Sequence, residues 1–173
     1  MKLLIGASKD FKFHLEEFGE ALKRQGVNCE IVNVTDYGSG FLSKNIKNWF
    51  SNKKFRNLIT ELNPDIILID GRTVFGNYAI KAGFPLYYHI RGDEWAETQW
   101  ALQTLHTNLL KRLVIWFRIK RAEKCYKNCT MIIPICKYLD NIVKQYYPEK
   151  KTYVLHGGIT PSRWYPSKGM TLK

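Results

Sequence analysis

The sequence predicts an α/β fold, a Rossmann-like parallel sheet with helices on both faces, over residues 1–159. Short apolar runs alternate along the whole chain with segments whose apolar residues recur at helical spacing. Several runs are apolar throughout, which is typical of strands buried on both faces of a parallel sheet. A chain of 173 residues is long enough for one domain with a proper core. Residues 160–173 contain two prolines and a glycine with little periodicity, and are predicted to be an interdomain linker or tail.

Each predicted element follows from a local pattern. In the first half, apolar runs predict strands, helical spacing predicts helices, and glycines or Asn63-Pro64 separate them. These elements are a strand at 2–7, a helix from 11 to 25, a strand at 29–34, a loop at 35–40, a helix at 41–62 and a strand at 65–70. The second half continues with a helix at 74–82, a central strand at 85–90, one long helix at 101–126, a strand at 131–135, a helix at 137–147 and a last strand at 152–155.

The charge balance suggests an anionic partner. The chain carries 27 Lys and Arg against 15 Asp and Glu, a formal charge of +12. A polyanion, an anionic membrane or a phosphorylated ligand would suit such a surface, and a merely solvated basic surface is the alternative. Residues 109–124 mix basic with apolar and aromatic side chains, which is typical either of a helix lying on an anionic bilayer or of a core-facing helix with a basic outer face. No nucleic-acid reader motif is present, so we expect no nucleic acid partner.

Several classes of protein are not indicated. The four cysteines have neither C-x-x-C spacing nor a nearby histidine partner, so we predict no metal site and a reduced, cytoplasmic protein, peripheral at most on the inner membrane face. The chain spells neither G-x-G-x-x-G after its first strand nor a phosphate-binding loop, and we predict no cofactor. The apolar start is too short for a signal peptide, and no run approaches a membrane span.

Polar residues follow three predicted strands at the edge where open α/β sheets bind ligands. The three sets are Gly6, Ala7 and Ser8; Asp70, Gly71 and Arg72; and Arg91, Gly92, Asp93 and Glu94. Glycines allow close approach of a ligand to the backbone, and helix starts offer N–H groups to anions.

The side chains of the third set suggest roles in ligand binding and proton transfer. Arg91 is suited to clamp a phosphate or carboxylate, and Asp93 or Glu94 to accept a hydroxyl proton. His89 lies on the same strand face as Arg91. The alternatives are an Arg91–Asp93 pair that only pins the loop, and a core histidine at His89.

Two stretches carry a resemblance to a known family. Residues 125–166, CYKNCTMIIPICKYLDNIVKQYYPEKKTYVLHGGITPSRWYP, resemble a run of apolar strand, helix and strand leading to a His-Gly-Gly turn and an aromatic-x-Pro ending. FPLYYHIRGDEW is similar to a Pro-led strand near the acceptor site. The family is that of the retaining GT-B-fold glycosyltransferases, which includes lipopolysaccharide and phosphatidylinositol mannosyltransferases. The chain resembles the N-terminal, acceptor-side domain, one half of a GT-B fold.

The resemblance implies transfer of a sugar from a nucleotide-sugar donor to an acceptor hydroxyl, on a lipid-linked or phosphorylated acceptor. The donor would bind mainly to a second domain that this sequence does not contain, so the domain alone should turn over little. Arg91 stands where many members have histidine, and Cys136 where they have serine. Arg91, His89 and Asp93 would be catalytic. The substrate-binding residues would be Gly6, Ala7, Ser8, Asp70, Gly71, Arg72, Gly92, Glu94, Lys137, His156, Gly157 and Gly158. A non-catalytic sugar- or anion-binding module and, less favoured, a basic nucleic-acid binder are the alternatives.

Overall fold

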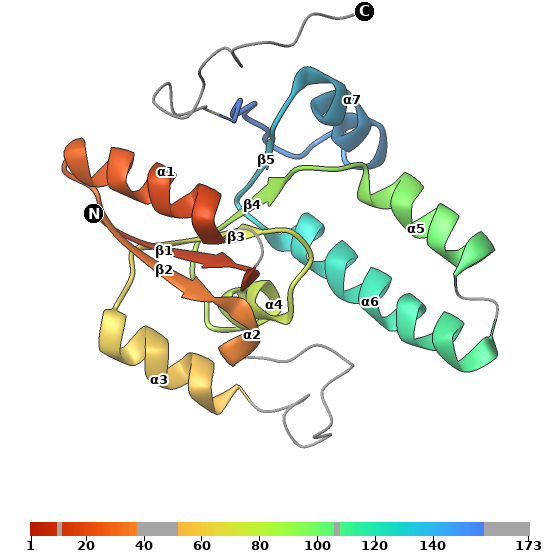
Figure 1. Cartoon of the computed structure of the whole chain (residues 1–173), viewed down its shortest axis with the longest axis horizontal. Coiled ribbons are helices and arrows are strands. Elements are labelled where there is room, and N and C mark those ends of the chain that lie inside the picture. Colours follow the sequence, from red (N-terminus) through yellow and green to blue (C-terminus); the bar gives the residue numbers. More distant parts are fainter. Residues whose placement is uncertain (10–11, 38–51, 106–107, 158–173) are drawn as a thin grey trace, which may run out of the picture.

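The computed structural model describes residues 1–9, 12–37, 52–105 and 108–157. Its centre is a five-stranded sheet in the order β2-β1-β3-β4-β5, in which every neighbouring pair is parallel (Figure 1). The strands are β1 (Lys2–Ala7), β2 (Asn28–Asn33), β3 (Ile66–Asp70), β4 (Leu86–Ile90) and β5 (Met131–Pro134). The predicted parallel α/β fold is therefore confirmed.

The strand order creates a topological switch point. From β1, the chain adds β2 on one side and then β3, β4 and β5 on the other. The crevice outside the carboxyl ends of strands at such a reversal is the usual ligand-binding place in open α/β sheets. In this chain it lies between the ends of β1 and β3.

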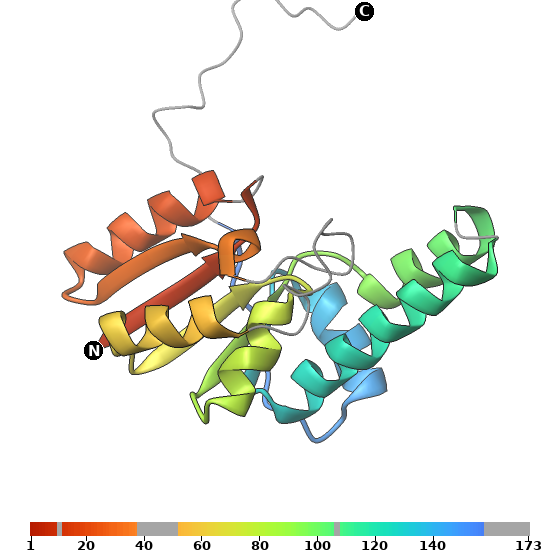
Figure 2. The same cartoon turned by 90° about the horizontal axis from the view of Figure 1, so that it is seen from below.

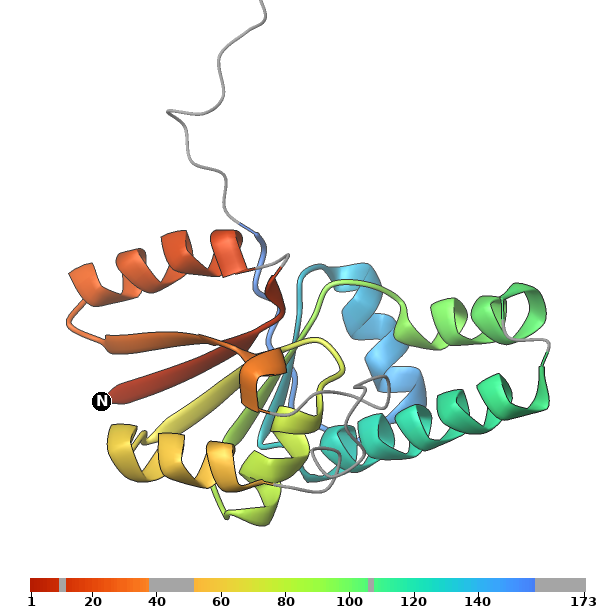
Figure 3. The same cartoon turned by 60° about the horizontal axis from the view of Figure 1, so that its bottom comes forward.

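Alternating side chains divide the core between the two faces of the sheet. Leu3, Ile5 and Ala7 belong to one buried cluster with Leu15 of α1 (Lys12–Arg24), whereas Leu4 belongs to the other. The second cluster also takes in buried residues of α3 (Lys53–Leu62), α4 (Val74–Lys81) and α7 (Lys137–Tyr146). Figure 3 shows α1 on one side of the sheet and α3 and α4 on the other. We call these the α1 face and the α4 face.

The predicted single helix over 101–126 is wrong. Two helices cover this region, α5 (Glu94–Thr104) and α6 (Leu109–Asn128). Asn108 begins α6 because its side chain accepts a hydrogen bond from the backbone N–H of Leu110 at 2.9 Å. The two helices form a hairpin that projects from the sheet (Figure 2).

Four smaller expectations also change or fall outside the described residues. Residues 34–37 form a short helix, α2 (Val34–Tyr37), where a loop was predicted from residue 35. In the last predicted strand, only Thr152 forms an isolated bridge, with Ile132 of β5. Of the helix predicted over 41–62, the structure describes α3, and residues 41–51 and the predicted linker 160–173 lie outside the described residues.

Candidate functional site

Asp70, at the end of β3, joins His89 of β4 and Arg91, the residue that follows β4. Its Oδ1 accepts hydrogen bonds from His89 Nδ1 at 2.8 Å and from Arg91 Nε at 2.9 Å. An ionised carboxylate only accepts hydrogen bonds, so Nδ1 is the donor and Nε2 of a neutral His89 is an acceptor. Oδ2 of Asp70 is buried and has no hydrogen-bond partner within the described parts of the chain. A buried oxygen left in this state is uncommon in folded proteins and points to a role beyond packing.

The Asp70 cluster lies on the α1 face. Leu68 of β3 belongs to the cluster of buried residues beneath α1, and Asp70 is two residues further along the same strand. Tyr87, His89 and Arg91 alternate in the same way with Tyr88 and Ile90, which lie on the α4 face. The predicted common face of His89 and Arg91 agrees with their shared partner. Arg91 pairs with Asp70, whereas the alternative interpretation assigned it to Asp93.

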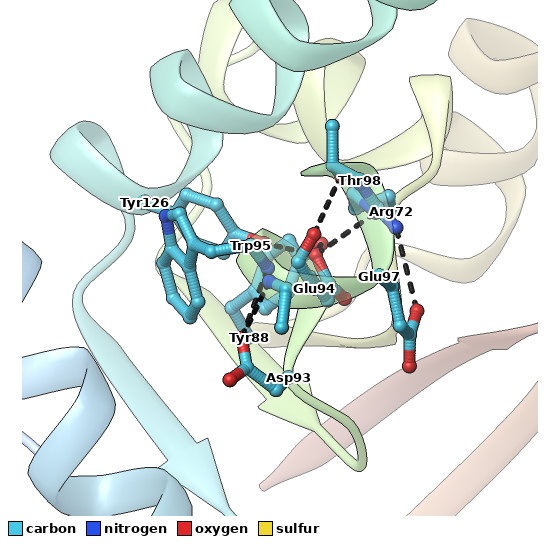
Figure 4. A network of polar contacts seen from close by, with 9 residues as sticks. Arg72, Tyr88, Asp93, Glu94, Trp95, Glu97, Thr98 and Tyr126 are labelled. Carbon is cyan, nitrogen blue, oxygen red and sulfur yellow. Dashed lines mark hydrogen bonds and ion pairs between the residues drawn. The ribbon is translucent and has the colours of Figure 1, made fainter. Parts of the chain in front are cut away.

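A second polar cluster lies on the α4 face, centred on the buried Glu94 (Figure 4). Its Oε2 lies 3.1 Å from Arg72 Nε and accepts hydrogen bonds from the hydroxyls of Tyr126 and Tyr88, the latter at 3.4 Å. Arg72 Nη1 also donates to Thr98 Oγ1 at 2.5 Å, and Nη2 lies 3.6 Å from Glu97 Oε2. Arg72 thus links the end of β3 to the first turns of α5.

Burial dominates the protonation of Glu94. Desolvation raises the pKa of its carboxyl to about 7, against the opposing effects of the Arg72 charge and the Tyr126 hydrogen bond. The same burial, reinforced by the Glu94 charge, raises the pKa of Tyr126 far above that of an ordinary phenol. Glu94 therefore changes its charge near neutral pH, while both tyrosines remain hydrogen-bond donors.

We expect this carboxyl to make the chain less stable as pH rises from about 4.5 to 7. Over that range the unfolded Glu94 is ionised while the folded one retains its proton, so the folded state binds more protons. The pKa difference corresponds to a loss of about 3 kcal/mol. Urea unfolding of the wild type and Glu94→Gln between pH 4.5 and 8 measures it: the free energy of unfolding of the variant should lack this slope. Parallel pH profiles for the two proteins would contradict the assignment.

Asp93 is the N-cap of α5, and the absence of a side chain at Gly92 leaves space for the carboxylate of Glu97. The Asp93 carboxylate accepts from the backbone N–H groups of Trp95 and Ala96, at 3.2 and 2.9 Å. A Cβ at position 92 would lie 2.5 Å from Glu97 Oε1. In this structure both residues shape the start of the helix, which gives Asp93 a structural role beside the catalytic role predicted from the sequence.

The remaining predicted residues are scattered. Gly6 and Ala7 are buried, and a Cβ at Gly6 would lie 2.9 Å from Val34 Cγ1, so close packing requires the glycine. Gly71 has φ +76°, a conformation that favours glycine in the turn after β3. Lys137 pairs with Asp140 at 2.6 Å. His156 and Gly157 are exposed, and Gly158 lies outside the described residues.

A cavity of about 580 Å³ opens on the α4 face at the switch point. Ser8 and Arg72 reach it from the ends of β1 and β3, and Arg118 and Arg121 reach it from α6. The remaining lining residues are Val34, Thr35, Thr73, Val74, Tyr88, Glu97, Thr98, Trp100, Ala101, Ile115, Ile119, Ala122 and Cys125. Sequence reasoning found Ser8 and Arg72 but missed Arg118 and Arg121 as cavity residues, although their i, i+3 spacing places them on one side of a helix.

The predicted site is therefore two sites at one edge of the sheet. The strand pleat sends Asp70, His89 and Arg91 to the α1 face, while Arg72, Glu94 and the cavity lie on the α4 face. In the parts of the chain that the structure describes, no cluster of His, Cys, Asp and Glu could hold a metal ion.

The sequence matches no protein family and no curated protein. Among solved structures, the chain is similar to the UDP-GlcNAc 2-epimerase from Methanocaldococcus jannaschii, with a TM-score of 0.59 and 13% identity. The fold is a GT-B-like Rossmann domain. The similarity covers 89% of this chain and 45% of the epimerase, so the chain spans less than half of that protein. At this identity the likeness establishes the fold and leaves the narrower resemblance to retaining glycosyltransferases as a hypothesis.

Proposed function

We propose that the chain is the acceptor-side domain of a glycosyltransferase, which moves a sugar from a nucleotide-sugar donor to an acceptor hydroxyl. The observation that carries the proposal is the Asp70 cluster. A buried carboxylate with one unpartnered oxygen holds a histidine and an arginine at the carboxyl ends of two central strands. The similarity to part of a UDP-GlcNAc 2-epimerase adds support, since that enzyme is named for a nucleotide sugar.

The geometry supports a division of roles. Asp70 holds Nδ1 of His89, so that Nε2 can accept the proton of an acceptor hydroxyl. The hydroxyl oxygen then bonds to the anomeric carbon, the bond from that carbon to the donor phosphate breaks, and nucleoside diphosphate leaves. Arg91, anchored on Asp70, contributes positive charge beside the reacting groups. The donor would be held mainly by a further domain or subunit.

The experiment measures transfer of radiolabelled sugar from nucleotide-sugar donors to a lipid extract of the source cells. The purified protein is supplemented with cell extract, which would supply a donor-binding domain or subunit. We expect Asp70→Asn to reduce transfer about tenfold, because the amide cannot hold the His89 tautomer and Arg91 in the same way. Asp65→Asn is the matched control: this residue lies just before β3 and accepts a hydrogen bond from the backbone N–H of Lys2. Equal transfer by wild type and Asp70→Asn would refute the assignment.

A non-catalytic sugar- or anion-binding module is the second candidate, because the open oxygen of Asp70 and the Arg91 guanidinium could hold a hydroxyl or an anion without any bond being broken. In that case Arg91→Gln would weaken binding of a sugar or anion, and no preparation of wild-type protein would transfer label. Conversion of the donor sugar without an acceptor would instead indicate epimerase-like chemistry.

We also propose that the α5–α6 hairpin contacts an anionic membrane surface. Its outer end exposes large apolar side chains, here called the hairpin patch: Leu105, Leu109, Leu110, Leu113, Trp116 and Phe117. Lys111, Arg112 and Lys120 lie among them, and residues 109–122 contain no acidic residue. Basic side chains of this kind can bind anionic lipid headgroups, while the apolar side chains insert into the upper acyl region. Within the described residues no helix is both long and apolar enough to span a bilayer.

A further inference from the structure

The arginines of the cavity on the α4 face are unequally neutralised. Arg72 is paired with Glu94 at 3.1 Å and lies 3.6 Å from Glu97. Arg118 and Arg121 have no ion pair with any acidic side chain that the structure describes. Glu123, the acidic residue nearest to them along α6, pairs with Lys120 at 2.9 Å. The α6 side of the cavity therefore carries uncompensated positive charge.

The surroundings of Arg118 strengthen this conclusion. Its side chain is exposed at the cavity, yet the protein packed around it, and then the charge of Arg72, lower the pKa of its guanidinium. A partly desolvated guanidinium with another cation nearby gains from an anion that binds beside it.

The apolar side chains that line the cavity suit the carbon portion of a ligand. Trp100 and Ala101 of α5 and Ile115 and Ile119 of α6 line the same cavity as the arginines. Thr35, Thr73 and Thr98 add hydroxyl groups. Thr73 Oγ1 is buried and has no hydrogen-bond partner within the residues described. The combination of a cationic side, an apolar side and an unpartnered hydroxyl is typical of small-molecule sites with a few fixed polar contacts.

We propose that this cavity binds a phosphate monoester, with the phosphate between Arg118 and Arg121 and the carbon portion against Trp100 and the isoleucines of α6. The site goes beyond the proposed function, because it lies on the opposite face of the sheet from Asp70 and does not depend on sugar transfer. Glu97 is the acidic residue of the lining, and its proximity to Arg72 keeps its charge from cancelling those of Arg118 and Arg121.

Isothermal titration of the full chain with phenyl phosphate tests the proposal, with phenol as the probe that lacks the phosphate. We expect saturable binding of phenyl phosphate that weakens with salt, and no comparable binding of phenol. Arg118→Gln and Arg121→Gln should each weaken binding about tenfold. Lys127→Gln, which removes one positive charge from exposed surface on the same helix outside the cavity, should leave binding unchanged.

Ala101→Phe provides a second, uncharged test. It fills part of the cavity without altering the charge, and should weaken phenyl phosphate as well, while circular dichroism and thermal unfolding confirm that the variant folds. The proposal is overturned if wild-type protein does not bind phenyl phosphate, if Lys127→Gln weakens binding as much as Arg118→Gln, or if Ala101→Phe folds and binds normally. None of these outcomes depends on the transfer assay, so the two proposals can fail separately.

Discussion

Arg72→Met should destabilise the chain by about 3 kcal/mol at pH 8. The substitution keeps most of the side-chain volume but leaves Glu94 buried without its cation, and breaking such a pair typically costs several kcal/mol. The partial exposure of Arg72 places the value at the lower end of that range. Because Arg72 lowers the pKa of Glu94, its removal raises that pKa further, and the loss should shrink at pH 5.5, where Glu94 is protonated. Urea unfolding at the two pH values measures both quantities.

The double variant Arg72→Met/Glu94→Gln separates the ion pair from the packing. It removes both charges, so it should recover much of the stability lost by Arg72→Met at pH 8. Lys23→Met is the control, since its partner Glu20 is exposed and surface ion pairs contribute little. A loss for Arg72→Met that is the same at both pH values, and that the second substitution does not relieve, would mean that Arg72 stabilises the chain through packing alone.

The parallel sheet could be predicted from sequence because its strands are buried on both faces. Runs such as residues 66–70 and 86–90 are apolar or aromatic except for Asp70 and His89 near their ends, and turns at Gly71 and Gly83 have φ values that favour glycine. The spacing of His89 and Arg91 also sufficed to place both on one face. Strand alternation depends only on the backbone of the strand itself, so it can be predicted without knowing how the rest of the chain packs.

The helical hairpin could not be predicted in the same way. Periodicity assumes that apolar residues are buried, yet Leu109 and Leu110 at the start of α6 are 82% and 72% exposed. In the sequence, these leucines continue the helical spacing of apolar residues through 105–108. The N-cap at Asn108 was therefore not recognised. The N-cap role of Asp93 was not predicted because an N-cap and a general base use the same residue type at the same kind of position, just after a strand, and its catalytic role stays a prediction.

Contacts distant in sequence account for the rest of what was missed. Tyr126 reaches Glu94 over 32 residues, and this hydrogen bond depends on how α6 packs beside β4. The division of the site into two faces follows from strand alternation, whereas the cavity on the α4 face depends on how α6 packs. The sequence shows that polar residues gather at the ends of β3 and β4, but the packing of α5 and α6 decides which of them line the cavity.

Replacing Leu110 and Leu113 with aspartate should reduce binding to anionic vesicles about 100-fold. Both side chains belong to the hairpin patch and are more than half exposed, so the substitutions should not disturb folding. Transfer of two leucines into the acyl region contributes about 3 kcal/mol, and the introduced carboxylates add repulsion from the lipid headgroups. Co-sedimentation with vesicles of phosphatidylglycerol and phosphatidylcholine measures the binding, and vesicles of phosphatidylcholine alone should bind wild-type protein more weakly.

The control variant must add the same two negative charges as Leu110→Asp/Leu113→Asp, but at exposed large side chains outside the hairpin patch. Tyr138 and Tyr153 are 65% and 63% exposed and lie in and after α7, so Tyr138→Asp/Tyr153→Asp alters the net charge by the same amount. This variant should retain most of the vesicle binding, since only general attraction to the surface is reduced. Equal losses in the two double variants would show that net charge alone drives binding. If wild-type protein fails to bind vesicles and instead sediments as a dimer that Leu110→Asp/Leu113→Asp dissociates, the patch contacts a second copy of the chain and the membrane proposal is wrong.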